Sequence, residues 1–281
     1  MNIQWYPGHM TKTRRMIAEN LKLIDAVCEI IDARIPVSSR NPDLDEITEK
    51  KPRLIVFNRV DQADPQQNNK WVNKLKNDGA TVIETDCKSG KGIEKISQSI
   101  HKLLEEKLKG YAAKGQTGRR IRLMVAGIPN VGKSSFINRA AKKKAAQTSD
   151  KPGVTRGKQW INLSDSIELL DTPGILWPKF DDEAVAENLA FTGAIRDEVM
   201  DIEELGAKLM LRLKEFYPQS ITERYKLQIP DNTDGYELLL QAAKNRGFIL
   251  ARAQYDTRRM AAVLLDEFRG GKLGRITLEK I

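Results

Sequence analysis

One octapeptide near the middle of the chain constrains the fold more than any other feature. Residues 127–134 read G-I-P-N-V-G-K-S and fit the pattern G-x-x-x-x-G-K-[ST], in which backbone N–H groups of a glycine-rich loop point at phosphate oxygens. The apolar run at residues 121–126 predicts a buried strand before this loop, and residues 134–141 predict a helix after it. A phosphate-binding loop between a buried strand and a helix is typical of parallel α/β sheets.

Two further motifs accompany this P-loop, and their order along the chain is unusual. Residues 171–174 read D-T-P-G and stand where a motif for Mg²⁺ and the γ-phosphate is expected. The N-K-x-D pattern, which reads a guanine base, has no match after residue 174. The one good candidate is N-R-V-D at residues 58–61, upstream of the P-loop. This order predicts a GTP-binding fold that has been circularly permuted.

The chemistry of the predicted phosphate site follows from a few side chains. We expect Lys133 to place its charge beside the β- and γ-phosphates, and Ser134 to offer its hydroxyl to Mg²⁺. Thr155 is a candidate switch threonine that would complete the magnesium shell, with an ordinary loop threonine as the alternative. Asp171 is expected to hold the metal through a water molecule, and the Gly174 N–H to reach the γ-phosphate.

The predicted base site discriminates guanine from adenine through Asp61. A carboxylate accepts both N1–H and N2–H₂ of guanine, whereas adenine would leave its charge unpaired at a cost of about 1–3 kcal/mol. We expect Asn58 to tie the base-binding loop to the P-loop. The stem of Arg59, which replaces the usual lysine, is expected to cover the purine face. Residues 86–88 read D-C-K where GTPases carry S-A-K, and backbone N–H groups would act there.

The predicted site lacks one usual catalytic side chain. Where Ras-like enzymes place a glutamine, this chain has Ile175, which can neither donate nor accept a hydrogen bond. Asn130 is similar to the asparagine of potassium-dependent GTPases, so K⁺ is one candidate for the missing charge. His9 is another, because imidazole can accept a proton from water and donate to phosphate at neutral pH. The alternative for His9 is packing beside Trp5 and Tyr6 or capping of the following helix. The predicted nucleotide-binding residues are Asn58, Arg59, Val60, Asp61, Asp86, Cys87, Lys88, Asn130, Val131, Gly132, Lys133, Ser134, Ser135, Thr155 and Gly174; the predicted metal ligands are Ser134, Thr155, Asp171 through water, and Asn130 for K⁺.

Short apolar runs alternate with helical patterns up to residue 174. This alternation predicts a mostly parallel, doubly wound sheet with ligands at the carboxyl ends of its strands. Helical patterns dominate afterwards. We therefore expect an α/β fold with a circularly permuted P-loop GTPase domain at residues 1–178 and an all-helical domain at residues 179–281. Expected strands are 26–31, 53–57, 81–84, 121–126, 160–163 and 167–170; expected helices include a basic one at 10–24, then 93–108, 183–192, 202–216, 220–227, 236–245 and 257–268, with a linker at 110–118.

Charge is distributed unevenly along the chain. The net charge is +9, and residues 107–160 hold 14 Lys and Arg against one acid, Asp150. A solvent-exposed face alone does not explain such an excess of basic residues. We therefore expect some of them to bind nucleotide phosphates and the others to bind a polyanionic partner. There is no apolar run long enough to span a membrane and no apolar N-terminal leader. Cys28 and Cys87 are expected to be free thiols in a reducing cytoplasm.

Several segments together carry a family resemblance: W-Y-P-G-H-M at 5–10, D-A-R-I-P at 32–36, P-N-V-G-K-S at 129–134, P-G-V-T at 152–155, the apolar residue after 171–174, and F-R-G-G-K-L-G at 268–274. Through them the chain resembles the circularly permuted GTPases of the YlqF type along its whole length. The resemblance implies a cytoplasmic GTPase that uses GTP and Mg²⁺ and binds a late precursor of the large ribosomal subunit. It further implies ribosome-stimulated hydrolysis and a helical domain in contact with ribosomal RNA, with ribosomal proteins as further partners. Because members share His9 while lacking the glutamine, the resemblance favours the catalytic interpretation of this histidine.

Two classes of function stay open at this point. The favoured hypothesis is a monomeric, RNA-stimulated GTPase that promotes a late step of large-subunit maturation. The alternative is a nucleotide-gated RNA-binding module with negligible turnover, since Ile175 removes the usual catalytic group. A GTPase for protein or membrane partners is disfavoured by the basic run, and salt-sensitive co-sedimentation with ribosomes would test that choice.

Overall fold

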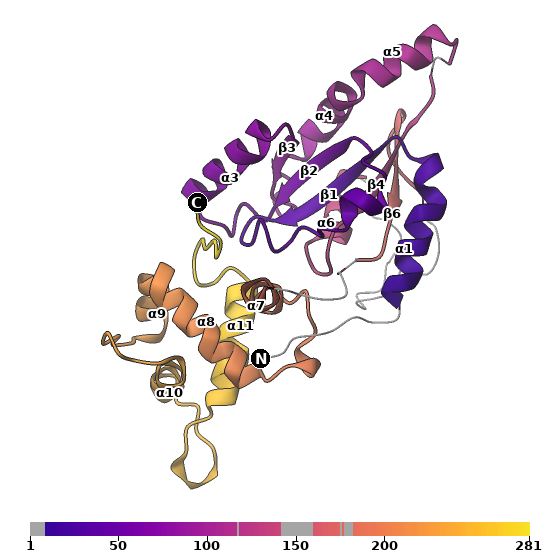
Figure 1. The fold of residues 1–281 in the computed structure, drawn as a ribbon. Coiled ribbons are helices and arrows are strands. Elements are labelled where there is room, and N and C mark those ends of the chain that lie inside the picture. Colours follow the sequence, from indigo (N-terminus) through magenta and orange to yellow (C-terminus); the bar gives the residue numbers. More distant parts are fainter. Residues whose placement is uncertain (1–8, 117, 142–159, 175, 177–181) are drawn as a thin grey trace.

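The structure, a computed structural model, describes residues 9–116, 118–141, 160–174, 176 and 182–281 of the 281-residue chain, without the side chains of residues 9–13 and 253. It has an α/β part around one sheet and, beside it, a part made of helices (Figure 1). The expected combination of a mostly parallel α/β fold with a C-terminal helical region is confirmed.

Six strands of the described chain form a single sheet in the order β3-β2-β1-β4-β6-β5. Neighbouring strands are parallel except for β5, which is antiparallel to β6. All seven residues of β1 are buried, as expected of a central parallel strand that is covered on both faces. Each predicted strand is present, and the bounds are β1 Ala26–Asp32, β2 Arg53–Asn58, β3 Thr81–Thr85, β4 Ile121–Ala126, β5 Trp160–Ser164 and β6 Ile167–Asp171.

Helices cover both faces of this sheet. On one face, Ile17 of α1 and Trp71 of α3 belong to the apolar clusters beside β1, β4 and β2. On the other face, Ile100 of α4 and Phe136 of α6 pack in the main cluster. The described helices of this part are α1 His9–Asn20, α2 Leu44–Ile47, α3 Pro65–Asn77, α4 Ile96–Leu103, α5 Glu105–Ala113 and α6 Lys133–Ala140, with 3₁₀ turns at Leu21–Leu23 and Ile93–Lys95.

Three helix boundaries differ from the sequence-based expectations. The helix expected at 10–24 is α1, which ends at Asn20 before a 3₁₀ turn. The helix expected at 93–108 is interrupted at Leu104, where the backbone leaves helical geometry. The segment expected as a linker at 110–118 begins inside α5, which continues to Ala113. Lys109 stabilises α5 through its 3.0 Å ion pairs with Glu105 and Glu106, one and nearly one turn earlier.

Four helices of the second part begin at aspartate caps. The side chains of Asp182, Asp201, Asp234 and Asp256 accept hydrogen bonds from the first backbone N–H groups of α7, α8, α10 and α11. Such caps satisfy donors that have no partner within the helix. The described helices here are α7 Glu183–Phe191, α8 Ile202–Phe216, α9 Pro218–Tyr225, α10 Gly235–Asn245 and α11 Thr257–Arg269, with 3₁₀ turns at Asp197–Val199 and Ala251–Ala253.

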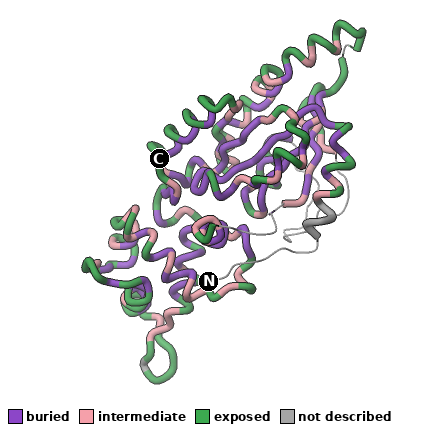
Figure 2. The backbone as a smooth tube through the Cα atoms, viewed as in Figure 1, coloured by how far each residue is buried: buried purple, intermediate pink, exposed green. Residues whose placement is uncertain are grey.

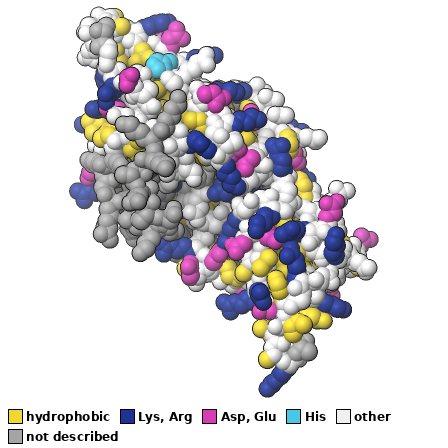
Figure 3. All heavy atoms as spheres, turned by 180° about the vertical axis from the view of Figure 1, so that it is seen from behind, with side chains coloured by type: hydrophobic (Ala, Val, Ile, Leu, Met, Phe, Trp, Pro, Cys, Tyr) yellow, Lys and Arg dark blue, Asp and Glu magenta, His cyan; other side chains and the backbone are white. Residues whose placement is uncertain are grey.

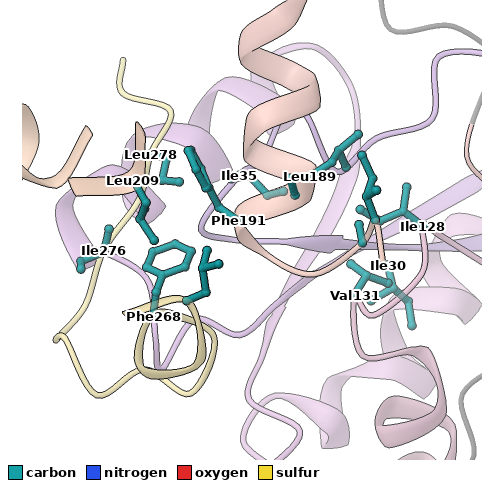
Figure 4. Packing of buried hydrophobic residues seen from close by; sticks show 14 of the residues in the cluster. Ile30, Ile35, Ile128, Val131, Leu189, Phe191, Leu209, Phe268, Ile276 and Leu278 are labelled. Atoms are coloured by element: carbon teal, nitrogen blue, oxygen red, sulfur yellow. The ribbon is translucent and has the colours of Figure 1, made fainter. Parts of the chain in front are cut away.

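A continuous apolar cluster joins the two parts of the molecule. Figure 4 shows it running from Ile30 and Val131 through Leu189 and Phe191 to Phe268. The buried stretches in Figure 2 follow the strands and the inner sides of the helices. After α11 the chain returns to the α/β part, where its C-terminus lies beside α3 (Figure 1). No helix among the described residues is long and apolar enough to cross a membrane.

Candidate guanine-nucleotide site

The P-loop connects the carboxyl end of β4 to the first turn of α6, as the octapeptide predicts. Two glycines are required by its shape. At Gly132, φ is +100° and a Cβ atom would lie 2.4 Å from Asn58 Nδ2; at Gly127, a Cβ would lie 2.6 Å from the Ile30 carbonyl oxygen. Ser134 and Ser135 are exposed at the start of α6. The loop therefore presents a helix N-terminus and two hydroxyl groups to a ligand.

Lys133 is buried beneath this loop. Its Nζ donates hydrogen bonds to the carbonyl oxygens of Gly127, at 3.1 Å, and Ile128, at 2.8 Å. Burial lowers the pKa of Lys133 to about 8, although the nearby Asp171 carboxylate acts in the opposite direction. A cation in this position is poorly solvated, so the negative charge of a phosphate would stabilise it.

The D-T-P-G segment lies against the P-loop. Asp171 ends β6, in register with Val125 of β4, and Thr172 Oγ1 donates a 2.6 Å hydrogen bond to the Val125 carbonyl. Burial raises the pKa of Asp171, while Lys133 lowers it. A Cβ on Gly174 would lie 2.7 Å from the Pro129 nitrogen and 3.0 Å from Lys133 Nζ. The backbone of this segment therefore reaches the P-loop, and any larger residue at 174 would separate the two.

Asn58 connects three segments of the site. Its Nδ2 donates a 3.0 Å hydrogen bond to the Val131 carbonyl in the P-loop, so the expected tie between the two loops is confirmed. Its Oδ1 accepts from Thr85 Oγ1 at 3.2 Å and from Cys87 Sγ at 3.1 Å. Burial raises the pKa of Cys87 to about 11, which keeps the thiol protonated as a donor. Asp61, three residues further on, is exposed.

Arg59 adopts a left-handed backbone conformation, with φ +62°, and contacts the P-loop. Its Nη2 donates a 2.8 Å hydrogen bond to the Asn130 carbonyl, and its Nε lies 3.6 Å from Asp32 Oδ2. Asn130 in turn donates from Nδ2 to the Gly193 carbonyl, just beyond α7, at 2.6 Å. The base motif, the P-loop and the helical part are thus joined through one arginine and one asparagine.

Residues 86–88 form a turn between β3 and α4. The Lys88 N–H donates to Asp86 Oδ1 at 2.8 Å. Arg139 of α6 donates to the carbonyl oxygens of Cys87, at 3.2 Å, and of Lys88. The turn is therefore held against the helix that follows the P-loop.

A buried ion pair between Asp32 and Arg34 lies next to the N-R-V-D loop. From the sequence these two residues have no assigned role and are named only as part of the segment that carries the family resemblance. Asp32 Oδ2 and Arg34 Nη2 are 2.8 Å apart, and their side chains are 2% and 1% exposed. Burial would raise the pKa of Asp32, but the charge and hydrogen bonds of Arg34 hold it below its ordinary value. Arg34 Nη1 also donates to the carbonyl oxygens of Phe268 and Arg269 at the end of α11. The available sequence signal is a pair of opposite charges at the end of a mostly apolar strand, with Asp32 as its last residue.

The structure brings most predicted site residues together at the carboxyl ends of β2, β3, β4 and β6. Three predicted positions stay untested, because Thr155, Ile175 and the side chain of His9 lie outside the described residues. Within the described part of the chain, no group of three or more His, Cys, Asp or Glu side chains is arranged to hold a metal.

The convergence of a P-loop, a D-T-P-G strand end and an upstream N-R-V-D loop defines a P-loop GTPase with permuted motif order. Residues 122–224 match the family model described as "50S ribosome-binding GTPase". "Ribosome biogenesis GTPase A" of Bacillus cereus is 45% identical over 280 residues, covering 99% of this chain and 94% of the relative. The chain belongs to the ribosome biogenesis GTPase A family, and it is a GTPase.

Two solved structures are similar over the whole chain. The GDP-bound structure of TM YlqF has a TM-score of 0.70 at 27% identity, covering 95% of this chain and 99% of that one. GNP-bound YlqF from T. maritima has a TM-score of 0.66 at 27% identity, covering 96% and 98%. Guanine nucleotides thus occupy relatives that share this fold.

Proposed function

We propose that this GTPase is a monomeric, cytoplasmic assembly factor that binds the precursor of the large ribosomal subunit and promotes a late maturation step. The family supports this proposal, because relatives that match the whole chain are named for ribosome biogenesis and the matching family model for 50S binding. The structural observation that supports a nucleotide-dependent role is the hydrogen bond between Asn130 of the P-loop and Gly193 beyond α7, which links the nucleotide site to the helical part. Through this contact a nucleotide can bias how the helical part is held.

The proposed nucleotide contacts follow the geometry of the site. Lys133 and the loop N–H groups would hold the β- and γ-phosphates, and Asp61 would accept from the guanine edge. The donor set suits Mg²⁺, which prefers oxygen ligands and retains water. The exposed Ser134 hydroxyl would bind it directly, and the Asp171 carboxylate would do so through water. The metal would neutralise charge that develops on the phosphates during hydrolysis. Thr155 is proposed as the remaining magnesium ligand.

His9 is proposed as the catalytic group. The competing proposal is that K⁺ bound at Asn130 supplies the positive charge that stabilises the transition state. His9 begins α1, and its imidazole would orient the attacking water when the protein is bound to the ribosome. At Asn130, Nδ2 donates to the Gly193 carbonyl, and the amide oxygen Oδ1 is the atom that would bind a cation. Ribosomal RNA itself is the third source of stabilising charge.

The proposed RNA partner matches the charge distribution. Residues 244–281 carry nine Lys and Arg against four acids. In Figure 3 basic side chains spread over both parts of the molecule. Arg119, Arg120 and Arg122, together with Glu168, line a cavity of about 360 Å³. They lie at the amino end of β4, opposite the P-loop, where Arg120 and Arg122 pair with Glu168 and Arg119 lies 3.5 Å from Asp25. A polyanion bound there would be one other than the nucleotide, and it would compete with these carboxylates.

We also propose that the GTPase domain occupies residues 1–178 and the helical domain residues 179–281, with the permutation join near residues 110–118. In this arrangement the segment after Gly174 leads directly from the γ-phosphate motif into α7. Hydrogen exchange of residues 175–200 should then differ between GDP and a non-hydrolysable GTP analogue. Equal protection in the two states would contradict this coupling.

Single-turnover GTP hydrolysis with and without large-subunit precursor tests the proposal. We expect stimulation by the subunit in wild type, and a loss of about 10- to 1000-fold in stimulated hydrolysis for His9→Ala with nucleotide and subunit binding retained. The matched control is His101→Ala, which alters an exposed histidine of α4. Stimulated hydrolysis near wild type in His9→Ala, lost when Na⁺ replaces K⁺, would assign the role to the cation. Absence of stimulated turnover in wild type would favour the nucleotide-gated RNA-binding module.

A further inference from the structure

The last residues of the chain pack against the loop that carries the N-R-V-D motif. This C-terminal segment, residues 270–281, leaves α11 through Gly271, whose φ is +74° and whose Cβ would lie 3.0 Å from Gln62 Cγ. The Ile276 N–H then donates to the Gln62 carbonyl at 2.9 Å, and the Leu278 N–H donates to the Arg34 carbonyl at 2.8 Å. The segment therefore lies directly against the residues that follow Asp61.

Arg275 makes the most specific contact of this segment with the base motif. Its Nη2 donates to the Val60 carbonyl at 2.7 Å and its Nε to the Ala63 carbonyl at 3.0 Å. These two carbonyls flank Asp61 and Gln62. One planar guanidinium thus bridges both sides of the turn that presents the Asp61 carboxylate, and its rigid fork holds the two carbonyls at a set separation.

Independent anchors hold the C-terminal segment in place around Arg275. The Asp64 N–H donates to Thr277 Oγ1 at 3.1 Å, and the Tyr217 hydroxyl, just beyond α8, lies 3.0 Å from Asp64 Oδ2. The half-buried Glu279 carboxylate accepts from the Ser38 N–H at 2.9 Å and from Asn188 Nδ2 of α7 at 3.1 Å. The position of Arg275 is therefore determined by the α/β part and the helical part together.

We propose that Arg275 is a positioning residue for guanine recognition. By holding the carbonyls of Val60 and Ala63, it keeps the Asp61 carboxylate aimed at N1–H and N2–H₂ of the base. The inference rests on the proposed role of Asp61. Because Arg275 acts on the base end, its loss affects GDP and GTP equally and weakens the discrimination between nucleotides that differ at the guanine edge.

The test compares GDP with inosine diphosphate, which lacks the 2-amino group, in wild type and in Arg275→Ala. We expect wild type to prefer GDP. In the variant, the dissociation constant for GDP should rise about 5- to 30-fold, the scale of two lost hydrogen bonds, and the preference for GDP should fall toward one. Arg275→Lys, which keeps a donor, should recover part of the preference. Lys272→Ala removes an exposed cation of the same segment and should match wild type.

The outcomes separate the inference from its premise. If wild type does not distinguish the two nucleotides, the role of Asp61 falls, and the inference falls with it. If wild type prefers GDP and Arg275→Ala prefers it equally, Asp61 keeps its role and the inference about Arg275 is wrong. If Arg275→Ala does not fold, Arg275→Lys provides the test. A GDP preference and a GDP affinity both equal to wild type in Arg275→Lys would contradict the inference.

Discussion

The phosphate end and the base end of the site are built in different ways. At the phosphate end, Lys133 bonds to the carbonyls of Gly127 and Ile128, six and five residues earlier. The shape of this loop is a property of one short stretch of chain, in which glycines adopt backbone conformations that other residues resist. A loop of this kind is recognisable from its letters because its contacts are local.

The base end depends on partners that are far away in sequence. Asn58 bonds to Val131 across 73 residues, and Arg275 bonds to Val60 across 215 residues. The predicted phosphate site is therefore a local motif, whereas the predicted base site is held by contacts that form only when distant parts of the chain pack together. Variants that weaken long-range contacts should affect base recognition first, and variants of the P-loop should affect all nucleotides alike.

Loss of the buried Asp32–Arg34 pair should have the largest effect. Arg34→Ala leaves a buried carboxylate unpaired and should lower the free energy of unfolding by about 3–5 kcal/mol, as measured by urea denaturation. The combined variant Asp32→Asn with Arg34→Met should recover part of this loss, because no buried charge remains. Arg258→Ala on the exposed surface of α11 is the control, with a change within about 0.5 kcal/mol. A loss of that small size in Arg34→Ala would show that the pair is dispensable.

A change at Asp61 should alter which base is bound without altering the phosphate end. In Asp61→Asn the amide can donate where xanthine has an acceptor, so we expect GTP affinity to fall about 10- to 100-fold and affinity for xanthosine triphosphate to rise. Fluorescent-nucleotide titration measures both. Unchanged GTP affinity together with no binding of the xanthine nucleotide would remove residues 58–61 from the base site, and the comparison of the two ends would fail.

The pKa of Lys133 predicts a smaller, pH-dependent effect at the phosphate end. The free protein has a Lys133 pKa of about 8, and bound phosphate favours the protonated form. Below this pH the affinity should be level; above it, binding must take up a proton, and GDP affinity should fall by up to about tenfold per pH unit. Calorimetric titration at about pH 8.5 in two buffers of different ionisation enthalpy measures the proton uptake. Zero uptake would contradict the prediction.

The same pKa affects stability in the opposite direction. The pKa of Lys133 is lower in the folded protein than its ordinary value of 10.5. Between these two pKa values the unfolded chain binds more protons, so the free energy of unfolding contributed by this group rises with pH across that window. Nucleotide affinity and stability of the free protein should therefore change in opposite senses as the pH increases.

Elements with a strong local pattern were predictable from the sequence. Each of the six strands of the described chain coincides with a mostly apolar run in the sequence. The helices α7, α8, α10 and α11 each begin directly after an aspartate cap. Boundaries that depend on weak local preferences were less predictable. Residues 110–113, with their glycine and alanines, suggested a linker, yet they continue α5.

The sequence by itself was enough to predict the motifs of the site: a P-loop, a candidate magnesium motif and a candidate carboxylate for guanine, in permuted order. It did so because each motif needs only a few neighbouring residues to have its shape. Only the tertiary structure decided three long-range hydrogen bonds: from Arg34 to a carbonyl at the end of α11, from Asn130 to the Gly193 carbonyl, and from Arg275 to the Val60 carbonyl. These contacts join residues that no local pattern relates, because their partners meet only when the sheet and the helices pack.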